Sequence, residues 1–232
     1  MFSVIIPVLN QIKLTEQLFD GILKNTLLPS EIFLIDNASE DNYFDFLRKY
    51  EKLRIIYVRN EKNIMVNAAW NLGISLARQR YVTILNNDIL ISSTFFDKIK
   101  RAFDLDNKIG IVVPNTVKDI NYNLENTTKE IKIRELNKRE GWAFTIRKEI
   151  LNKIDPIPSC LNISCGDDYL FEWSKIKGYM NVKVMNNFIY HYGSATIVDN
   201  DFEKLCIITK KERLDWFEIK SQMYKKVEGE LA

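Results

Sequence analysis

Apolar and polar positions along the first half of the chain follow two alternating periods. Residues 2–8, FSVIIPV, are nearly all apolar, which is typical of a strand covered on both faces of a sheet. Residues 13–25 instead space their apolar side chains along one helical face. The two patterns recur and predict strands at 2–8, 31–36, 53–60, 81–86 and 109–114, with helices at 13–25, 40–50, 66–78 and 93–104.

This alternation of strands and helices predicts an α/β fold with a Rossmann-like, mainly parallel central sheet flanked by helices. Right-handed crossovers place the carboxyl ends of parallel strands along one edge, where ligands bind in open sheets. Polar residues follow four predicted strands at that edge: Asn10, residues 36–39, Arg59 with Asn60, and the tripeptide Asn86-Asn87-Asp88.

The second half of the chain is less regular. Pro114 is expected to stop the fifth strand, and the polar residues 115–140 favour a loop or hairpin. Residues 166–179 predict a helix that begins with Asp167 or Asp168 as its cap and ends before Gly178. Residues 181–196 predict a strand and then a loop.

The chain is expected to have two parts, a domain at 1–198 and a C-terminal helical extension at 199–232, made of one amphipathic helix or a helix pair. The extension is too apolar for a tail surrounded by water. Its apolar side chains would cover the domain, a second subunit of a homodimer, or a membrane surface. They are Leu205, Ile208, Leu214, Trp216, Phe217 and Ile219.

Composition narrows the class of protein. A formal net charge of +2 gives no sign of nucleic-acid binding, and three cysteines do not make a disulfide framework, which favours a reducing compartment. No apolar run approaches the roughly 18 residues that span a bilayer. We therefore expect a cytoplasmic protein, with peripheral contact to the inner membrane surface left open.

Four acidic residues and one histidine are candidates for chemistry. Asp88, at a strand's carboxyl end, is placed to hold a divalent cation, although Asn and Asp also favour plain turns. His191 is the single histidine, and its imidazole suits Mn²⁺ better than Mg²⁺, although a lone histidine is more often a packed or surface residue. Asp167 and Asp168 suit a helix start or a general base, and Asp36 suits a nucleobase N–H or a turn.

Six stretches in order resemble the family-2 inverting glycosyltransferases of GT-A fold, over residues 1–198. They are FSVIIPVLNQ, IFLIDNASED, NEKNIMVNAAWNLGISLA, YVTILNND, GDDYLFEWSKIKGY and YHYGSAT. Within that family, NND and HYGSAT look most like the branch that contains rhamnosyltransferases and related polysaccharide enzymes.

The resemblance implies a role for each candidate. Asp88 and His191 would hold the Mn²⁺ or Mg²⁺ ion with a diphosphate, Asp36 would bind the nucleobase, and Asp167 would be the general base with Asp168 beside it. The other implied nucleotide-binding residues are Pro7, Asn10, Asn63, Asn71 and Asn87.

The sequence departs from the family pattern at four positions. Asn86 replaces the first Asp of the Asp-x-Asp motif, and Gly166 replaces the Glu of the Glu-Asp pair. Ile64 stands where Gly is usual, and Trp70 where many relatives have a polar residue. These departures affect the prediction of which sugar is transferred, and of the fine geometry of the site, more than the prediction of the reaction class.

We therefore expect metal-assisted single displacement of a sugar from a nucleotide-diphosphate sugar onto a hydroxyl of a glycan, a lipid-linked glycan or a protein glycan. Two alternatives stay open, a catalytically degenerate nucleotide-sugar-binding module and a sugar nucleotidyltransferase. The second would need a glycine-rich loop after the first strand, and PVLNQIKLT contains no glycine.

Overall fold

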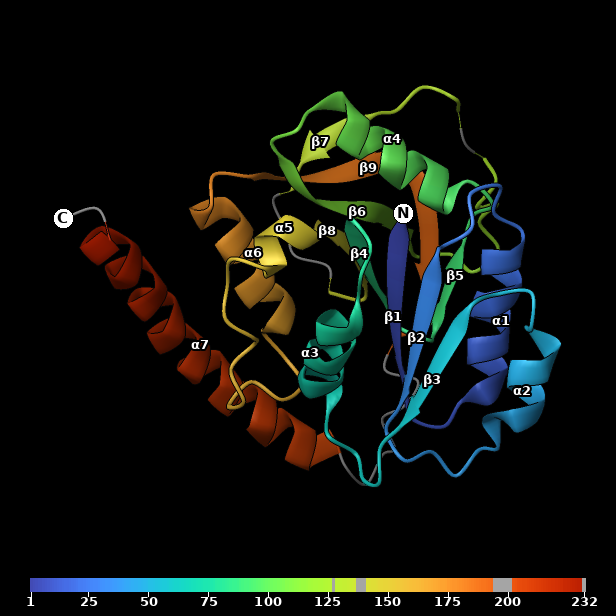
Figure 1. Ribbon diagram of the computed structural model, residues 1–232, viewed down its shortest axis with the longest axis horizontal. Helices are drawn as coiled ribbons and strands as arrows, with labels where there is room; N and C mark the ends of the chain where they lie inside the picture. The colour runs from blue at the N-terminus through green and yellow to red at the C-terminus, as the bar shows by residue number, and fades with distance from the viewer. Residues whose placement is uncertain (127, 137–140, 194–201, 231–232) are drawn as a thin grey trace.

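The computed structural model describes residues 1–126, 128–136, 141–193 and 202–230. Helices cover both faces of one sheet, whose described strands number nine (Figure 1). The strand order is β3-β2-β1-β4-β8-β6-β9-β5, and β7 pairs with β9 off this path.

The first half has the predicted alternation. Four parallel strands, β1 (Phe2–Val8), β2 (Glu31–Asp36), β3 (Ile55–Arg59) and β4 (Tyr81–Leu85), are connected by α1 (Ile12–Leu23), α2 (Tyr43–Lys49) and α3 (Val66–Leu76). Their carboxyl ends therefore meet at one edge, as the sequence predicted.

The sheet as a whole is mixed, so the expectation of a mainly parallel sheet was wrong. β8 (Ala143–Arg147) lies between β4 and β6 (Ile109–Val117) and is antiparallel to both. β5 (Ile89–Ile91) pairs antiparallel with β9 (Met180–His191). Only residues 86–88 separate β4 from β5, yet the two strands do not pair with each other, because β8, β6 and β9 lie between them in the sheet.

Pro114 does not end β6, contrary to expectation. The strand continues to Val117, and its parallel pairing with β9 shifts register between Val113 and Asn115. Proline has no N–H to donate, so this irregularity is where a strand can accommodate it.

The second half contains α4 (Phe95–Leu105), β7 (Ile133–Glu135), α5 (Lys148–Leu151), α6 (Gly166–Ile176) and α7 (Phe202–Glu230). Gly178 has a φ of 80°, which fits its predicted place just after a helix. The C-terminal segment is a single 29-residue helix rather than a pair. Among the described residues, no helix is long and apolar enough to cross a membrane.

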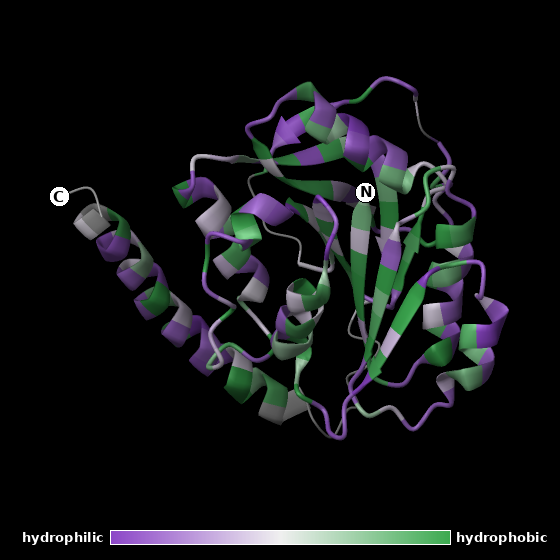
Figure 2. Cartoon of the chain, viewed as in Figure 1, coloured by the Kyte–Doolittle hydropathy of each residue, from purple (hydrophilic) through white to green (hydrophobic). Residues whose placement is uncertain are grey.

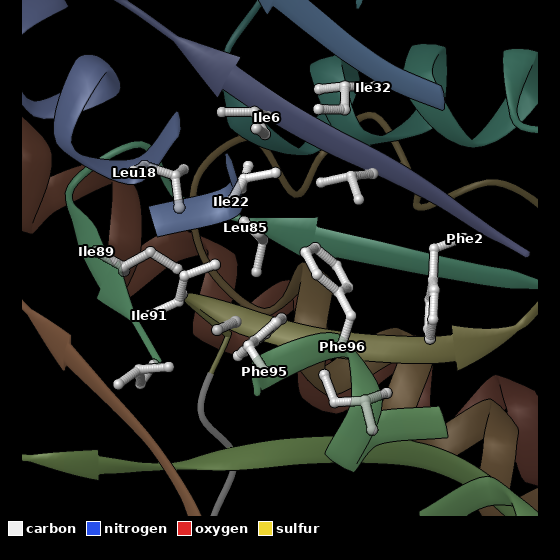
Figure 3. Close-up of a cluster of buried hydrophobic side chains, with 14 of the residues drawn as sticks. Phe2, Ile6, Leu18, Ile22, Ile32, Leu85, Ile89, Ile91, Phe95 and Phe96 are labelled. Atoms are coloured by element: carbon white, nitrogen blue, oxygen red, sulfur yellow. The ribbon is translucent and has the colours of Figure 1, made fainter. Parts of the chain in front are cut away.

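Two apolar clusters lie on opposite faces of the sheet. Alternate residues of β1 divide between them: Phe2, Val4 and Ile6 pack with α1 and α4, as Figure 3 shows for Phe2 and Ile6, while Ile5 packs with α3 and α6. The first strands, β1 to β4, are accordingly apolar along most of their length in Figure 2, whereas β7 is mainly hydrophilic. One face of α7 completes the second cluster through Trp216 and Met223, each 4% exposed.

Candidate active site

Loops at the carboxyl edge of the sheet are tied to one another by hydrogen bonds. The backbone N–H of Asn10, after β1, donates to Ser39 Oγ at 2.8 Å, and Asn10 Oδ1 accepts from the Glu40 N–H at 2.7 Å. The N–H of Ile12 donates to Asp41 Oδ2 at 2.9 Å. The loops that follow β1 and β2 therefore form one rigid rim.

Asp36 ends β2 beneath this rim with no exposed surface. Its carboxylate accepts from Ser39 N at 2.8 Å, Tyr57 Oη at 2.5 Å and Arg59 Nη1 at 2.6 Å. Burial opposes ionisation, but the hydrogen bonds from Ser39 and Tyr57 and the charge of Arg59 outweigh it, so the pKa of Asp36 lies below its ordinary value. A nucleobase N–H would share this carboxylate with Arg59, which the sequence placed at this edge of the sheet, and with Tyr57, which the sequence did not identify.

Asp88 and His191 meet where β5 pairs with β9. Asp88 Oδ1 and His191 Nε2 lie 3.2 Å apart, with side chains 8% and 16% exposed. The two atoms are not aligned as a hydrogen bond, and neither has another hydrogen-bond partner among the described residues. The register that pairs Ile89 with His191 brings these residues together although about a hundred positions separate them.

The chemistry of this pair fits a divalent metal. The Oδ1 atom of Asp88 and the Nε2 atom of His191 are buried and have no hydrogen-bond partner among the described residues, and a carboxylate with an imidazole is a donor set that Mn²⁺ accepts. Within the described residues, no group of three or more His, Cys, Asp or Glu side chains could hold an ion. The fit therefore requires phosphate oxygens and water for the remaining positions, which is usual for ions that bind with diphosphates.

Trp142, which the sequence analysis did not single out, stacks on the imidazole of His191. Its ring stacks on His191 at 5.0 Å between centroids and 14° between planes, and its Nε1 donates to Thr116 Oγ1 at 2.9 Å. The carbonyl of Trp142 accepts from the Asn86 N–H at 2.8 Å, which fixes the start of the tripeptide. In the sequence, the feature that could have pointed to this contact is the glycine followed by tryptophan in GWAF, residues 141–144.

Asp167 and Asp168 lie in the first turn of α6, half-buried. Neither is the helix cap, contrary to expectation: Cys165 occupies that position with a φ of 60° and makes no side-chain capping bond. Carboxylates in the first turn are still favoured as anions by the helix dipole. The location therefore remains suitable for an ionised base.

Gly141 lies between the acidic pair and the residue that contacts the Asp88–His191 pair. A Cβ on Gly141 would lie 2.7 Å from Asp167 Oδ2, so this carboxylate packs directly against the glycine backbone. The next residue, Trp142, stacks on His191. Two adjacent residues thus contact the two groups of predicted site residues, Gly141 through Asp167 and Trp142 through His191.

The structure also explains Gly166. A Cβ there would lie 2.1 Å from Asn67 Oδ1. Asn67 is 1% exposed and is held by hydrogen bonds from its Nδ2 to the carbonyls of Leu161 and Ser164. Asn67 therefore fills the space that a side chain at position 166 would occupy, and no acidic side chain fits there.

The other predicted nucleotide-binding residues are distributed unevenly. Pro7 is buried in β1, and Asn63 lies at an exposed turn where its Oδ1 accepts from the Met65 N–H. Asn71 uses both polar groups on the backbone of Ile157, and Asn87 donates to Thr15 Oγ1 at 3.1 Å. The contacts of Asn71 and Asn87 are structural, and their nucleotide roles stay predictions.

Cys165 is not an alternative nucleophile. It is 7% exposed, and burial, reinforced by the charges of Asp168 and Asp167, raises the pKa of its thiol to about 11. The thiol is therefore neutral near pH 7 and poorly nucleophilic.

Solved structures with the same fold include several nucleotide-sugar enzymes. S. aureus TarS 1-349 in complex with UDP aligns with a TM-score of 0.66 and 20% identity over 90% of this chain and 64% of that chain. The mannosyltransferase PcManGT from Pyrobaculum calidifontis, in complex with GDP-Man and Mn²⁺, aligns with a TM-score of 0.64 and 16% identity over 82% and 56%. At these identities the likeness shows the fold, which is of GT-A type.

Curated relatives are more similar in sequence. Glycosyltransferase GlyG of Streptococcus pneumoniae serotype 4 is 26% identical over 66% of this chain and 59% of its own length. Chondroitin synthase of Escherichia coli is 25% identical over 67% of this chain and 21% of its own. The chain thus spans only part of these relatives. The model of glycosyl transferase family 2 matches residues 3–164, which is well over half of the chain. The chain therefore belongs to glycosyl transferase family 2.

Proposed function

We propose that this protein transfers a sugar from a nucleotide-diphosphate sugar to a hydroxyl acceptor by single displacement with inversion. The observation that supports the proposal is the junction at Gly141 and Trp142, two adjacent residues of which the first packs against Asp167 and the second stacks on His191. Single displacement needs a base on the acceptor side and charge stabilisation on the leaving-group side. The site offers both.

Asp167 takes the proton from the acceptor hydroxyl as that oxygen bonds to the anomeric carbon. The bond from that carbon to the diphosphate oxygen breaks, and its electron pair leaves with the diphosphate. Asp88 and His191 would hold a divalent cation, which would supply positive charge beside the leaving group. Packing against Gly141 fixes the Asp167 carboxylate, and stacking on Trp142 fixes the imidazole of His191.

The donor is proposed to lie along the rim formed by the loops after β1 and β2, with its base near Asp36 and Arg59. Arg59 is half-exposed beside the buried Asp36, so its guanidinium is accessible to a ligand. A neighbouring structure contains UDP and another contains GDP-Man, and NND and HYGSAT resemble the rhamnosyltransferase branch. The candidate donors are therefore UDP-, GDP- and dTDP-sugars.

A donor panel tests this function. UDP-N-acetylglucosamine, GDP-mannose and dTDP-rhamnose would each be incubated with the protein and Mn²⁺, with and without a mixture of glycan and lipid-linked acceptors. We expect metal-dependent release of nucleoside diphosphate from one donor, abolished by EDTA. Nucleotide binding without any turnover would instead support a degenerate binding module, and release of pyrophosphate from a nucleoside triphosphate and a sugar phosphate would support a nucleotidyltransferase.

A further inference from the structure

The C-terminal helix α7 places a buried carboxylate against the loop that precedes α6. Glu212 is 1% exposed. Its Oε1 accepts from the Asn162 N–H at 2.8 Å, and its Oε2 accepts from the Ser164 N–H and the Ser164 hydroxyl, both at 2.7 Å. The Ile163 N–H lies 3.2 Å from each oxygen. One side chain thus holds three consecutive backbone donors and a hydroxyl.

Such an arrangement fixes the backbone of the loop. Residues 162–164 belong to no helix or strand, so their N–H groups depend on partners elsewhere. A buried carboxylate is tolerated only where hydrogen bonds replace its lost hydration, and bonds to an ionised acceptor are about twice as strong as neutral ones. Glu212 therefore satisfies the N–H groups of this loop, and the same groups replace the lost hydration of its carboxylate, while Asn67 holds the carbonyl groups of the loop.

The loop that Glu212 holds leads directly into the acidic pair. Ser164 is followed by Cys165 in a left-handed conformation and then by the first turn of α6, which carries Asp167 and Asp168. A shift of the backbone at residues 162–164 would therefore move both carboxylates relative to Gly141 and the Asp88–His191 pair.

A second contact holds α6 itself. Glu172 of α6 is 4% exposed, and α7 supplies it with Tyr224 Oη at 2.5 Å and Lys220 Nζ at 3.1 Å. The helix α7 thus contacts the middle of α6 through Tyr224 and Lys220, and it contacts the loop before α6 through Glu212. Trp216 and Met223 pack α7 against the second apolar cluster. The polar contacts of Glu212 and Glu172 have a different effect from this packing, because they hold the backbone before α6 and the middle of α6.

We infer that Glu212 is a positioning residue for the reaction. It sets the backbone before α6 and thereby the place of Asp167 and Asp168. The inference rests on the proposed function, because it assigns the acidic pair to catalysis. It also makes α7 a working part of the active site.

The test compares Glu212→Gln and Glu212→Ala with Met223→Ala, a matched control that removes a buried α7 side chain with no hydrogen bond to the loop. Glu212→Gln keeps size but places an amide N–H₂ against donors of the loop. Hydrogen exchange is measured without ligand. It should be faster at Asn162–Ser164 and in the first turn of α6 in both Glu212 variants, but not in Met223→Ala. Unchanged exchange there would overturn the inference.

The second readout is the rate of turnover of the same variants. It is measured with whichever nucleotide sugar of the donor panel the wild-type protein uses. We expect kcat to fall about 10- to 100-fold in Glu212→Gln, as small misplacements of catalytic groups do, while the Kd for the matching nucleoside diphosphate with Mn²⁺ stays within about twofold. Faster exchange with unchanged kcat, or an equal loss of kcat in Met223→Ala at equal Tm, would overturn it. If wild type turns over no donor, the proposed function fails, and the exchange data still decide whether Glu212 holds the loop.

Discussion

At the scale of single residues, Asp36 shows how a buried carboxylate is kept ionised. The hydrogen bonds from Ser39 and Tyr57 and the charge of Arg59 hold its pKa below the ordinary value despite burial. Its contribution to stability is therefore complete above the ordinary pKa of about 3.9 and is lost as the pH falls through the lower pKa of the folded state.

Asp36→Asn tests this account. At pH 7 we expect the free energy of unfolding to fall by about 1–3 kcal/mol, the range for hydrogen bonds to a charged group. The difference from wild type should shrink as the pH drops below about 4, because wild type then loses the same interactions. Denaturant titrations from pH 7 to pH 3 measure it, and a difference independent of pH would contradict the assignment. If Asp36 also binds the nucleobase, the donor KM should rise more than kcat falls.

Gly166 and Asn67 form a second pair that can be tested. A Cβ at Gly166 would lie 2.1 Å from Asn67 Oδ1, so Gly166→Ala should destabilise the protein by about 1–3 kcal/mol through overpacking. In an Asn67→Ala background the same substitution should cost much less, since the obstructing atom is gone. Thermal unfolding of the four proteins of this cycle gives the coupling, and additive losses would show that Asn67 does not exclude a side chain at position 166.

At the scale of elements, the sequence predicted the first half well because each apolar run there matches one strand or helix. The mixed sheet was missed because β8 inserts antiparallel between β4 and β6, and because the three-residue strand β5 has its antiparallel partner in the distant β9. Local periodicity carries no information on such a distant pairing. The contact of Glu212 with residues 162–164 was missed for the same reason, since a single Glu in an amphipathic helix looks like a solvated position.

One face of the helix α7 packs on the rest of the protein. This was the first of the three surfaces that its apolar side chains were expected to cover. Trp216 and Ile219 pack on the second cluster, whereas Leu214 and Phe217 are 71% and 65% exposed. Deleting residues 200–232 would uncover that cluster and remove the contacts of Glu212. We expect a markedly lower Tm or aggregation, measured by thermal unfolding and light scattering. A truncated protein of unchanged stability would contradict the packing described for α7.

Substitution of the exposed face is the control for that deletion. Leu214→Ser with Phe217→Ser should leave Tm within about 1–2 °C, because both side chains already lie in water. The same variant tests the remaining expectations: a change in sedimentation or in binding to anionic vesicles would indicate a second subunit or a membrane surface.

At the scale of the whole molecule, the site combines residues from separate parts of the chain. Asp88 and His191 come together through the β5–β9 pairing, and Asp167 reaches the same region because Gly141 leaves room for it. The sequence identified Asp88, His191 and Asp167 as candidates, and the resemblance to a family gave them roles, whereas the contacts of Gly141, Trp142 and Glu212 were found in the structure. The family match ends at residue 164. The roles proposed for Asp167 and His191 therefore rest on the structure and on the experiments below.

The most direct test of the central claim compares nucleotide binding with turnover in Asp88→Ala, Asp167→Asn and Asp168→Asn. Titration calorimetry with Mn²⁺ and the nucleoside diphosphate of the active donor gives Kd, and diphosphate release gives kcat. We predict that Asp88→Ala loses metal-dependent binding and turnover, whereas Asp167→Asn keeps Kd and loses about 10²- to 10⁴-fold in kcat, more than Asp168→Asn. An inactive Asp168→Asn beside an active Asp167→Asn would move the base to Asp168. Full activity of Asp88→Ala or of wild type in EDTA, or near wild-type kcat in both α6 variants, would contradict the account.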